Sequence, residues 1–211
     1  VNNDLSAHYV LTNDIDLSAR TYDRAVIAPD TDHSDAGFNG TPFSGTFDGA
    51  GYKLLNLTVD TSNVTEDYPC YLGLFGKIEG GEVLNLGIEN AQISGSNNSE
   101  YLGGLCGGSD GTITNCYAAG SVSGGNYSIN LGGLCGGNRG TIENCYAAGS
   151  VSGGDDADYL GGLCGYNDGG IITNCYAAGS VSGGNSSYDL GGLCGLNEGT
   201  ITNCFWDTET S

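Results

Sequence analysis

The stretch "GGLCGGNRGTIENCYAAGSVSGG" at residues 132–154 decides the fold, because close copies of it precede and follow it. Units that start at Leu occupy residues 102–130, 131–159 and 160–189, and a partial fourth unit begins at Leu190. Self-similarity at a fixed period of this length is typical of solenoids and other repeat architectures. The sequence therefore predicts a stack of similar units, in which residues at the same place in each unit form columns.

The same pattern continues toward the N-terminus with hydrophobic residues in place of the cysteines. The segment 72–95 has Phe75 and Leu86 where the later units have their first and second Cys. We align Phe47 and Leu57 of the preceding segment with the same two positions. Because large apolar residues are most often buried, the cysteine positions are expected to lie in the core and to contact each other.

Each unit consists of short apolar stretches separated by glycine-rich turns, and the chain has 39 Gly among 211 residues. Helical repeats need amphipathic segments of about 10–15 residues, which are absent here. A propeller blade needs about 40–45 residues. We therefore predict an all-β parallel β-helix, or β-solenoid, of about seven coils with 29–30 residues per coil and strands about 4.8 Å apart. The predicted organisation is a single β-helix domain (1–211), with a divergent N-terminal coil or cap (1–42), two cysteine-poor coils (43–101) and cysteine-paired coils of which the last is incomplete (102–211).

An asparagine recurs at one bend of every unit. Asn tolerates the left-handed backbone of a sharp bend, and stacked amides hydrogen-bond to one another in cross-β structures. The simpler interpretation is that Asn suits any turn. We predict an inward or bend-lining ladder made of Asn56, Asn85, Asn115, Asn144, Asn174 and Asn203.

The repeated cysteines form pairs within the units. Contact between the two core positions of one coil favours a structural disulfide across each coil, worth about 2–3 kcal/mol by loop closure. Bonding along the stack is disfavoured, because a spacing of about 4.8 Å exceeds the preferred Cβ–Cβ separation of about 3.5–4.5 Å. Free buried thiols are the alternative, and the wide spacing disfavours metal or redox sites. The pairs are Cys106/Cys116, Cys135/Cys145, Cys164/Cys175 and Cys194/Cys204, and Cys70 is left over.

An aromatic residue follows the second Cys of each cysteine-containing unit, and strand alternation points it outward. An exposed row of rings can stack on sugar rings or pack on a partner. It can also do no more than stiffen the sheet through cross-strand stacking. The candidate binding row consists of Tyr117, Tyr146, Tyr176 and Phe205.

The chain carries 25 acidic against 5 basic residues, a formal charge of −20. Nucleic acids and anionic membrane surfaces recruit Lys and Arg, so neither is expected as a partner. No apolar run reaches the roughly 20 residues of a membrane span. Nine Cys without a C-x-x-C motif indicate an oxidising, extracellular setting. The lack of Met and of a signal peptide suggests a mature product or a piece of a larger secreted protein.

Candidate catalytic groups are few. His8 and His33 are the two histidines, and neither recurs in the units, so a nucleophile–base pair is hard to assemble. Loop carboxylates could serve glycoside chemistry or hold Ca²⁺, but loop acids are mostly solvated, and the calcium-binding nonapeptide of some repeat proteins is absent. We therefore predict no catalytic residue, no cofactor and no metal site.

The ordered succession of "YVLTNDIDLS", "FSGTFDGAGYKLLNLTVD", "YLGLFGKIEGGEVLNLGIEN" and the "GGLCG…GTITNCYAAGSV" copies resembles the GLUG-motif family of bacterial surface proteins. The resemblance covers nearly the whole chain. It implies a right-handed parallel β-helix in secreted, cell-wall or adhesin-like proteins, some of which accompany immunoglobulin A peptidase domains. The family attaches no catalytic residue to the motif, so none carries over.

These observations predict a non-catalytic module, extracellular or at the bacterial cell surface, with a structural or adhesive role. An open last coil offers unpaired strand edges. The expected partners are therefore further copies joined end to end into a fibre, or flanking domains of a larger chain. The alternative is a carbohydrate-binding or polysaccharide-active β-helix that binds host or environmental glycans through the aromatic row and the loop carboxylates.

Overall fold

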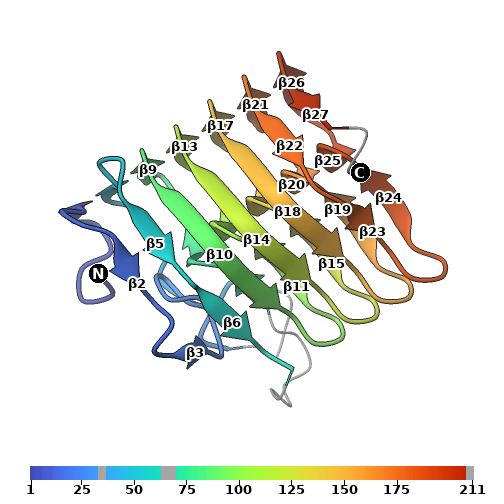
Figure 1. Cartoon of the computed structure of the whole chain (residues 1–211), viewed down its shortest axis with the longest axis horizontal. Helices are drawn as coiled ribbons and strands as arrows, with labels where there is room; N and C mark the ends of the chain where they lie inside the picture. Colours follow the sequence, from blue (N-terminus) through green and yellow to red (C-terminus); the bar gives the residue numbers. More distant parts are fainter. Residues whose placement is uncertain (33–36, 63–69, 208–211) are drawn as a thin grey trace.

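The structure is a computed structural model that describes residues 1–32, 37–62 and 70–207 (Figure 1). These residues contain 27 strands and no helix, and hence no helix that could span a membrane. Every recorded strand pair is parallel, for example β14 with β18 and β12 with β16. The predicted all-β parallel solenoid is therefore confirmed. His33 lies outside the described residues.

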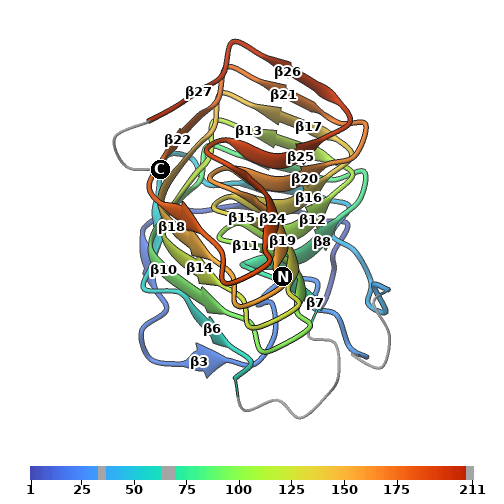
Figure 2. The same ribbon diagram turned by 90° about the vertical axis from the view of Figure 1, so that its right-hand side faces the viewer.

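A complete coil contributes one strand to each of four sheets. One such coil runs through β11 (Glu100–Gly103), β12 (Cys106–Ser109), β13 (Thr112–Thr114) and β14 (Tyr117–Ser123). The glycine-rich stretches form strands of their own, because their backbone groups pair with the coils above and below rather than with a side chain. Figure 2 shows the coils stacked one on another around a common interior.

Sheets A and B contain the longest stacks. Sheet A is ordered β1 (His8–Val10), β4 (Thr46–Asp48), β9 (Glu82–Leu84), β13, β17 (Thr141–Glu143), β21 (Ile171–Thr173) and β26 (Thr200–Thr202). Sheet B is ordered β2 (Ile15–Asp16), β5 (Lys53–Leu55), β10 (Gly87–Ser94), β14, β18 (Tyr146–Ser152), β22 (Tyr176–Ala178) and β27 (Phe205–Trp206). Three short strands join sheet B beside this path, namely β3 (Thr21–Tyr22), β6 (Thr58–Asp60) and β23 (Val181–Ser182).

Sheets C and D close the other side of each coil. Sheet C is ordered β8 (Phe75–Ile78), β12, β16 (Cys135–Asn138), β20 (Cys164–Asn167) and β25 (Cys194–Asn197). Sheet D is ordered β7 (Cys70–Leu72), β11, β15 (Ile129–Gly132), β19 (Asp158–Gly161) and β24 (Tyr188–Gly191).

The number of coils depends on the sheet in which they are counted. Sheet A has seven strands, whereas sheets C and D have five each. Five coils therefore have a strand in each of the four sheets. The two coils nearest the N-terminus have regular strands only in sheets A and B. Beneath β8 the sheet continues irregularly, through single bridges from Ile27 to Phe75 and from Phe43 to Ile78.

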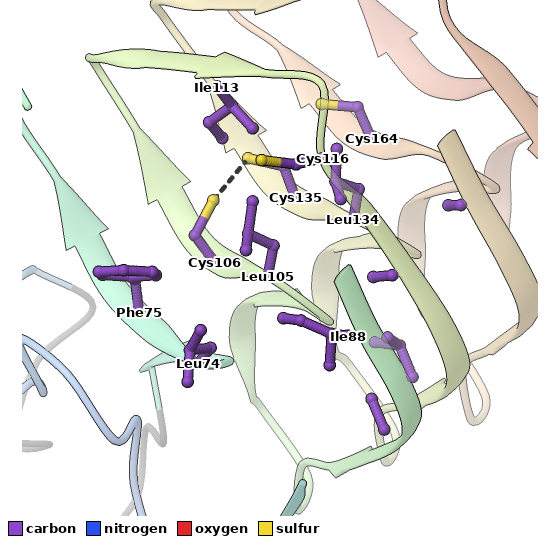
Figure 3. Packing of buried hydrophobic residues seen from close by; sticks show 14 of the residues in the cluster. Leu74, Phe75, Ile88, Leu105, Cys106, Ile113, Cys116, Leu134, Cys135 and Cys164 are labelled. Atoms are coloured by element: carbon purple, nitrogen blue, oxygen red, sulfur yellow. Dashed lines mark hydrogen bonds between the residues drawn. The ribbon is translucent and has the colours of Figure 1, made fainter. Parts of the chain in front are cut away.

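The interior is a continuous column of apolar side chains that point inward from all four sheets. Figure 3 shows leucine, isoleucine and cysteine side chains of successive coils converging there. Like residues stack on like, because the register pairs identical positions of neighbouring units. The stacked, fully buried residues include Ile113, Ile142 and Ile172 in sheet A and Leu102, Leu131 and Leu160 in sheet D.

The register corrects one part of the sequence alignment. Phe75 pairs with Cys106, as predicted. Phe47, however, pairs with Val83 in sheet A, and Leu57 accepts a hydrogen bond from the amide of Gln92. Both are core residues, but neither occupies a cysteine position. The segment 43–60 thus starts one strand later in its coil than the repeat pattern suggested.

Candidate functional site

The predicted aromatic row forms a straight column on the outside of sheet B. Tyr117 pairs with Tyr146, Tyr146 with Tyr176, and Tyr176 with Phe205. The first two rings are stacked, with centroids 4.7 Å apart and an angle of 4° between their planes. Tyr146 is 40% exposed and Phe205 is 66% exposed. Since stacked rings cover one another's faces, this part of the row presents mainly ring edges to a ligand.

A small polar network anchors the lower end of this row. The Tyr117 hydroxyl donates to Glu89 Oε1 at 2.8 Å, and Lys53 Nζ donates to the same oxygen at 2.6 Å. The hydrogen bond from Lys53, followed by the one from Tyr117, lowers the pKa of Glu89. Burial, together with the bond to Glu89, raises the pKa of Tyr117. The network therefore holds the first ring of the row in place.

The repeated cysteines form two columns inside the solenoid. Cys106, Cys135, Cys164 and Cys194 are register partners in sheet C. In that column Cys106 Sγ lies 3.3 Å from Cys135 Sγ (Figure 3). In the second column, the backbone amide of Cys116 donates to Cys145 Sγ at 3.4 Å, and that of Cys175 donates to Cys204 Sγ at 3.3 Å. The recorded contacts that join two cysteines therefore run between coils rather than across one coil.

All eight cysteines of the two columns are free thiols in the structure, so the predicted disulfides across each coil are unconfirmed. Cys70 is buried in β7. The hydrogen bond from Cys106 and burial raise the pKa of the Cys135 thiol, and the hydrogen bond with Cys116 is the main cause that raises the pKa of Cys145 to about 12. A thiol that stays protonated is a weak nucleophile and a weak metal ligand. Among residues 1–32, 37–62 and 70–207, no group of His, Cys, Asp and Glu is arranged to hold a metal ion.

The predicted asparagine ladder follows the bend between sheets A and B, and its members have left-handed backbones, with φ of 54° at Asn115 and 53° at Asn144. Asn115 donates to Asn85 at 3.1 Å, Asn174 to Asn144 at 3.2 Å and Asn203 to Asn174 at 3.3 Å. The side chains line the outside of the bend, since those of the later coils are exposed.

Asn56 does not belong to this ladder, which corrects the prediction. The register of β5 with β10 places Asn56 beside Asn90, whose amide donates to Asn56 Oδ1 at 3.3 Å. Asn56 in turn donates to Asp16 Oδ1 at 2.9 Å. The register of β4 with β9 pairs Asp48 with Leu84 and so places Gly49 beside Asn85, and the carboxylate of Asp48 accepts the Asn85 side-chain amide at 3.1 Å.

A second ladder was not predicted. Asn138 donates to Asn167 Oδ1 at 2.8 Å, and Asn167 donates to Asn197 Oδ1 at 2.7 Å, at the end of sheet C. Asn138 and Asn167 are fully buried. The signal in the sequence was a polar residue three places after the first Cys of each unit, as in "CGGN", "CGYN" and "CGLN".

A tyrosine-lined hollow on the outside of sheets C and D was also not predicted. At one register position of sheet C, Lys77 is followed in successive coils by Gly108, Gly137 and Tyr166. The two glycines leave a shallow depression of about 20 Å³ that is open to solvent. The half-buried rings of Tyr71 and Tyr101 lie over it, stacked at 4.6 Å with an angle of 10° between their planes.

Charged groups surround this hollow. Lys77 Nζ lies 3.2 Å from Asp110 Oδ2, and Arg139 Nε lies 2.6 Å from Asp168 Oδ2. The hydrogen bond to Asp168 raises the pKa of Arg139, so that its guanidinium stays charged. Burial raises the pKa of Tyr101, so that its hydroxyl stays neutral.

The fold, with its registered columns, defines a β-solenoid repeat protein. The family model described as "The GLUG motif" matches residues 98–123, 127–152 and 156–182. These three successive copies carry the GLUG motif, as the resemblance to that family predicted.

Two further comparisons each match part of a longer protein. It is 39% identical over 84 residues to halomucin of Haloquadratum walsbyi, a match that covers 39% of this chain and 1% of halomucin. The chain therefore matches only a very small part of that protein. A solved structure of a candidate immunoglobulin A1 protease from Bacteroides ovatus superposes with a TM-score of 0.54 at 21% identity, over 97% of this chain and 70% of the other. At that identity the likeness shows the fold alone.

Proposed function

We propose that the chain is a non-catalytic structural module of a bacterial surface or secreted protein, extending over 1–211 as one solenoid. The observation that carries the proposal is the unbroken stack of seven parallel strands in sheet A over one apolar interior. Such a stack resists bending, because each coil is hydrogen-bonded along its length to the next. The GLUG motifs and the similarity to a segment of halomucin support a place outside the cell.

Self-association is part of this proposal. In the last coil Leu190 is 42% exposed and Trp206 is 51% exposed. The last strands of the sheets, such as β26 and β27, have no further strand on their outer side among the described residues. Strand edges of this kind pair with other strands when no side chain or loop blocks them. Sedimentation velocity over a hundred-fold range of protein concentration tests it: the proposal expects growing assemblies, and a constant monomer counts against it.

Location is tested on intact cells of the source organism. An antibody against the purified chain should label unbroken cells or their spent medium, and external protease should remove the cell signal. A cytoplasmic enzyme of known activity serves as the control for leakage. Labelling that appears only after lysis would contradict an extracellular role.

A second candidate is a carbohydrate-binding or polysaccharide-active module that uses the aromatic row of sheet B. The alignment and exposure of Tyr146, Tyr176 and Phe205 favour it. Loss of glycan binding on replacing Tyr117, Tyr146 and Tyr176 together with Ala would support it. Retention of all glycan binding by that variant would exclude the row as the binding surface.

A further inference from the structure

We propose that Asn97, Asn126 and Asn185 are N-glycosylation sites, each joined to a sugar through its side-chain amide. The turn between sheets B and D has four equivalent copies, "GSNNS" (95–99), "GGNYS" (124–128), "GGDDA" (153–157) and "GGNSS" (183–187). Three of these copies contain Asn-x-Ser with x other than Pro, the acceptor sequence for sugar transfer to asparagine. The inference goes beyond the structural role proposed above and does not depend on it.

The four turns lie side by side along one edge of the stack (Figure 1). The residue between Asn and Ser has a left-handed backbone in each acceptor turn, with φ of 57° at Asn98, 59° at Tyr127 and 58° at Ser186. The three acceptor asparagines are exposed. A sugar attached to them therefore projects into solvent and displaces no residue of the core.

The fold uses the side-chain oxygen of these asparagines rather than the nitrogen. Asn97 Oδ1 accepts the backbone amide of Asn126 at 2.9 Å, and Asn126 Oδ1 accepts that of Asp155 at 2.9 Å. Asp155 Oδ1 accepts the backbone amide of Asn185 at 2.7 Å in the same way, so an aspartate serves this column as well as an asparagine does. Among the described residues, no hydrogen bond is recorded for Nδ2 of Asn97 or Asn126, which leaves both nitrogens available for substitution. Asn185 Nδ2 donates to Asp155 Oδ1 at 3.2 Å, and a substituted amide keeps the one hydrogen that this bond needs.

The two parts of the acceptor sequence are present together or absent together. The third turn has Asp155 in place of the asparagine and Ala157 in place of the serine. It keeps the conformation of the other turns, with φ of 56° at Asp156 and the same backbone pairing of Gly154 with the preceding turn. The fold therefore requires neither the asparagine nor the serine. Sugar transfer requires both, because the acceptor sequence includes the hydroxyl two residues after the asparagine.

The transfer needs an activated sugar phosphate as the co-substrate, either nucleotide-linked or lipid-linked. Nδ2 forms a bond to the anomeric carbon while the bond from that carbon to the phosphate oxygen breaks. The phosphate leaves with the bonding electrons, and Nδ2 loses one proton. Ser99 and Ser128 are fully buried in the folded chain, so the transferase acts before these turns pack. Because neighbouring coils are about 4.8 Å apart, Asn97 and Asn126 together have room for unbranched sugars but not for two branched glycans.

A further match to the acceptor sequence provides a control within the chain. The sequence "NLT" at residues 56–58 also fits. Asn56, however, is only partly exposed, and its Nδ2 donates to Asp16 Oδ1 at 2.9 Å while its Oδ1 accepts from Asn90 at 3.3 Å. Both ends of this amide are thus engaged, and we expect no sugar there. The match at residues 63–65 lies outside the described residues.

Glycopeptide mass spectrometry of the chain isolated from its source organism tests the proposal. Chymotryptic peptides separate the sites, because tyrosines lie between them, and electron-transfer fragmentation identifies the residue that carries the sugar. We expect sugar on Asn97, Asn126 and Asn185, and none on Asn56. A single hexose at each site would identify a nucleotide-linked donor, and a common oligosaccharide a lipid-linked donor; either result supports the sites.

Two substitutions at one position separate sugar transfer from folding. Ser128→Ala, expressed in the same organism, should abolish the sugar on Asn126 and leave that on Asn185 unchanged. The turn tolerates alanine at this position, because Ala157 is its equivalent in the next coil. Ser128→Thr keeps a hydroxyl in the acceptor sequence and should keep the sugar on Asn126.

Four results overturn the inference: bare peptides at all three sites, a sugar that stays on Asn126 in Ser128→Ala, a sugar bonded to a serine instead, or equal occupancy at Asn56. Circular dichroism spectra of the parent chain and both variants show that each is folded. None of these results bears on the structural role, which concerns the stacked coils and not the turns at their edge.

Discussion

The two neighbouring isoleucines of β21 provide a direct test of which face of the coil is inside. Ile172 is fully buried and stacks between Ile142 and Ile201, whereas Ile171 is 47% exposed. Removing three carbons from a fully buried isoleucine costs about 2–5 kcal/mol in free energy of unfolding, because the transfer free energy is lost and a cavity remains. Removing the same atoms from an exposed position changes it by about 0.5 kcal/mol.

Urea unfolding measures the difference. With an m-value of about 2–3 kcal/mol/M for a chain of this size, a loss of about 3 kcal/mol lowers the midpoint by about 1–1.5 M. We expect that shift for Ile172→Ala and a shift of about 0.2 M for Ile171→Ala. Far-UV circular dichroism follows the whole solenoid, and the fluorescence of Trp206, the single tryptophan, follows the last coil. Coincident curves from both probes show that one cooperative transition is being measured.

Equal losses in the two variants would refute the reasoning, and so would a larger loss for Ile171→Ala. Because side chains alternate between the two faces of a strand, a slip of one residue exchanges the two positions. The reverse order would therefore mean that β21 is turned inside out.

Three other predictions concern thiols, glycines and pH. In native protein without reductant, a thiol reagent at pH 8 should reach only the partly exposed Cys194 and Cys204, whereas in urea at least eight thiols should react. If only about one thiol reacts in the unfolded protein, the cysteines are instead joined in disulfides across the coils. Gly149→Ala should lower the free energy of unfolding by at least about 2 kcal/mol, because φ is 144° there and the new Cβ would fall 1.7 Å from a backbone oxygen. The control is Gly80→Asn, in a turn with φ of 68° and open space around it, which should change that free energy by no more than about 0.5 kcal/mol in the same urea assay. Equal urea midpoints for the two variants would contradict the close approach of the coils. Burial raises the pKa of Glu100, so this carboxyl favours the folded state below its unfolded pKa of about 4.3 and loses that contribution as the pH rises through the folded pKa. The urea midpoint of Glu100→Gln should therefore equal that of the parent protein at pH 4 and exceed it at pH 7. A midpoint of the variant that is higher at pH 4 alone would contradict the raised pKa.

Much of the solenoid was predictable because four units are nearly identical. Cys106, Cys135, Cys164 and Cys194 are equivalent in sequence, and they are register partners in the structure. The replacement of a cysteine by Phe75 showed that this position is buried. Copies of one sequence must bury the same side chains, so aligning them is equivalent to stacking them.

The alignment failed where the units diverge. Asn56 was aligned with Asn85 because "LNL" occurs at both 55–57 and 84–86, whereas Asn90 lies between Glu89 and Ala91. Only the hydrogen bonds between β5 and β10 decide in favour of Asn90. A pattern with a period of two residues does not distinguish neighbouring strands that are both apolar on the inner face.

The sequence by itself determined the period, the parallel stacking, the inward columns of sulfur and the outward aromatic row of sheet B. These follow from the repeat and from strand alternation, which act within one coil. Only the tertiary structure decided that the contacts between cysteines run between coils, and that Tyr71 and Tyr101 lie over Gly108 and Gly137. The reason is that these contacts join residues about one coil apart, and the offset between stacked coils sets them rather than any pattern within a unit.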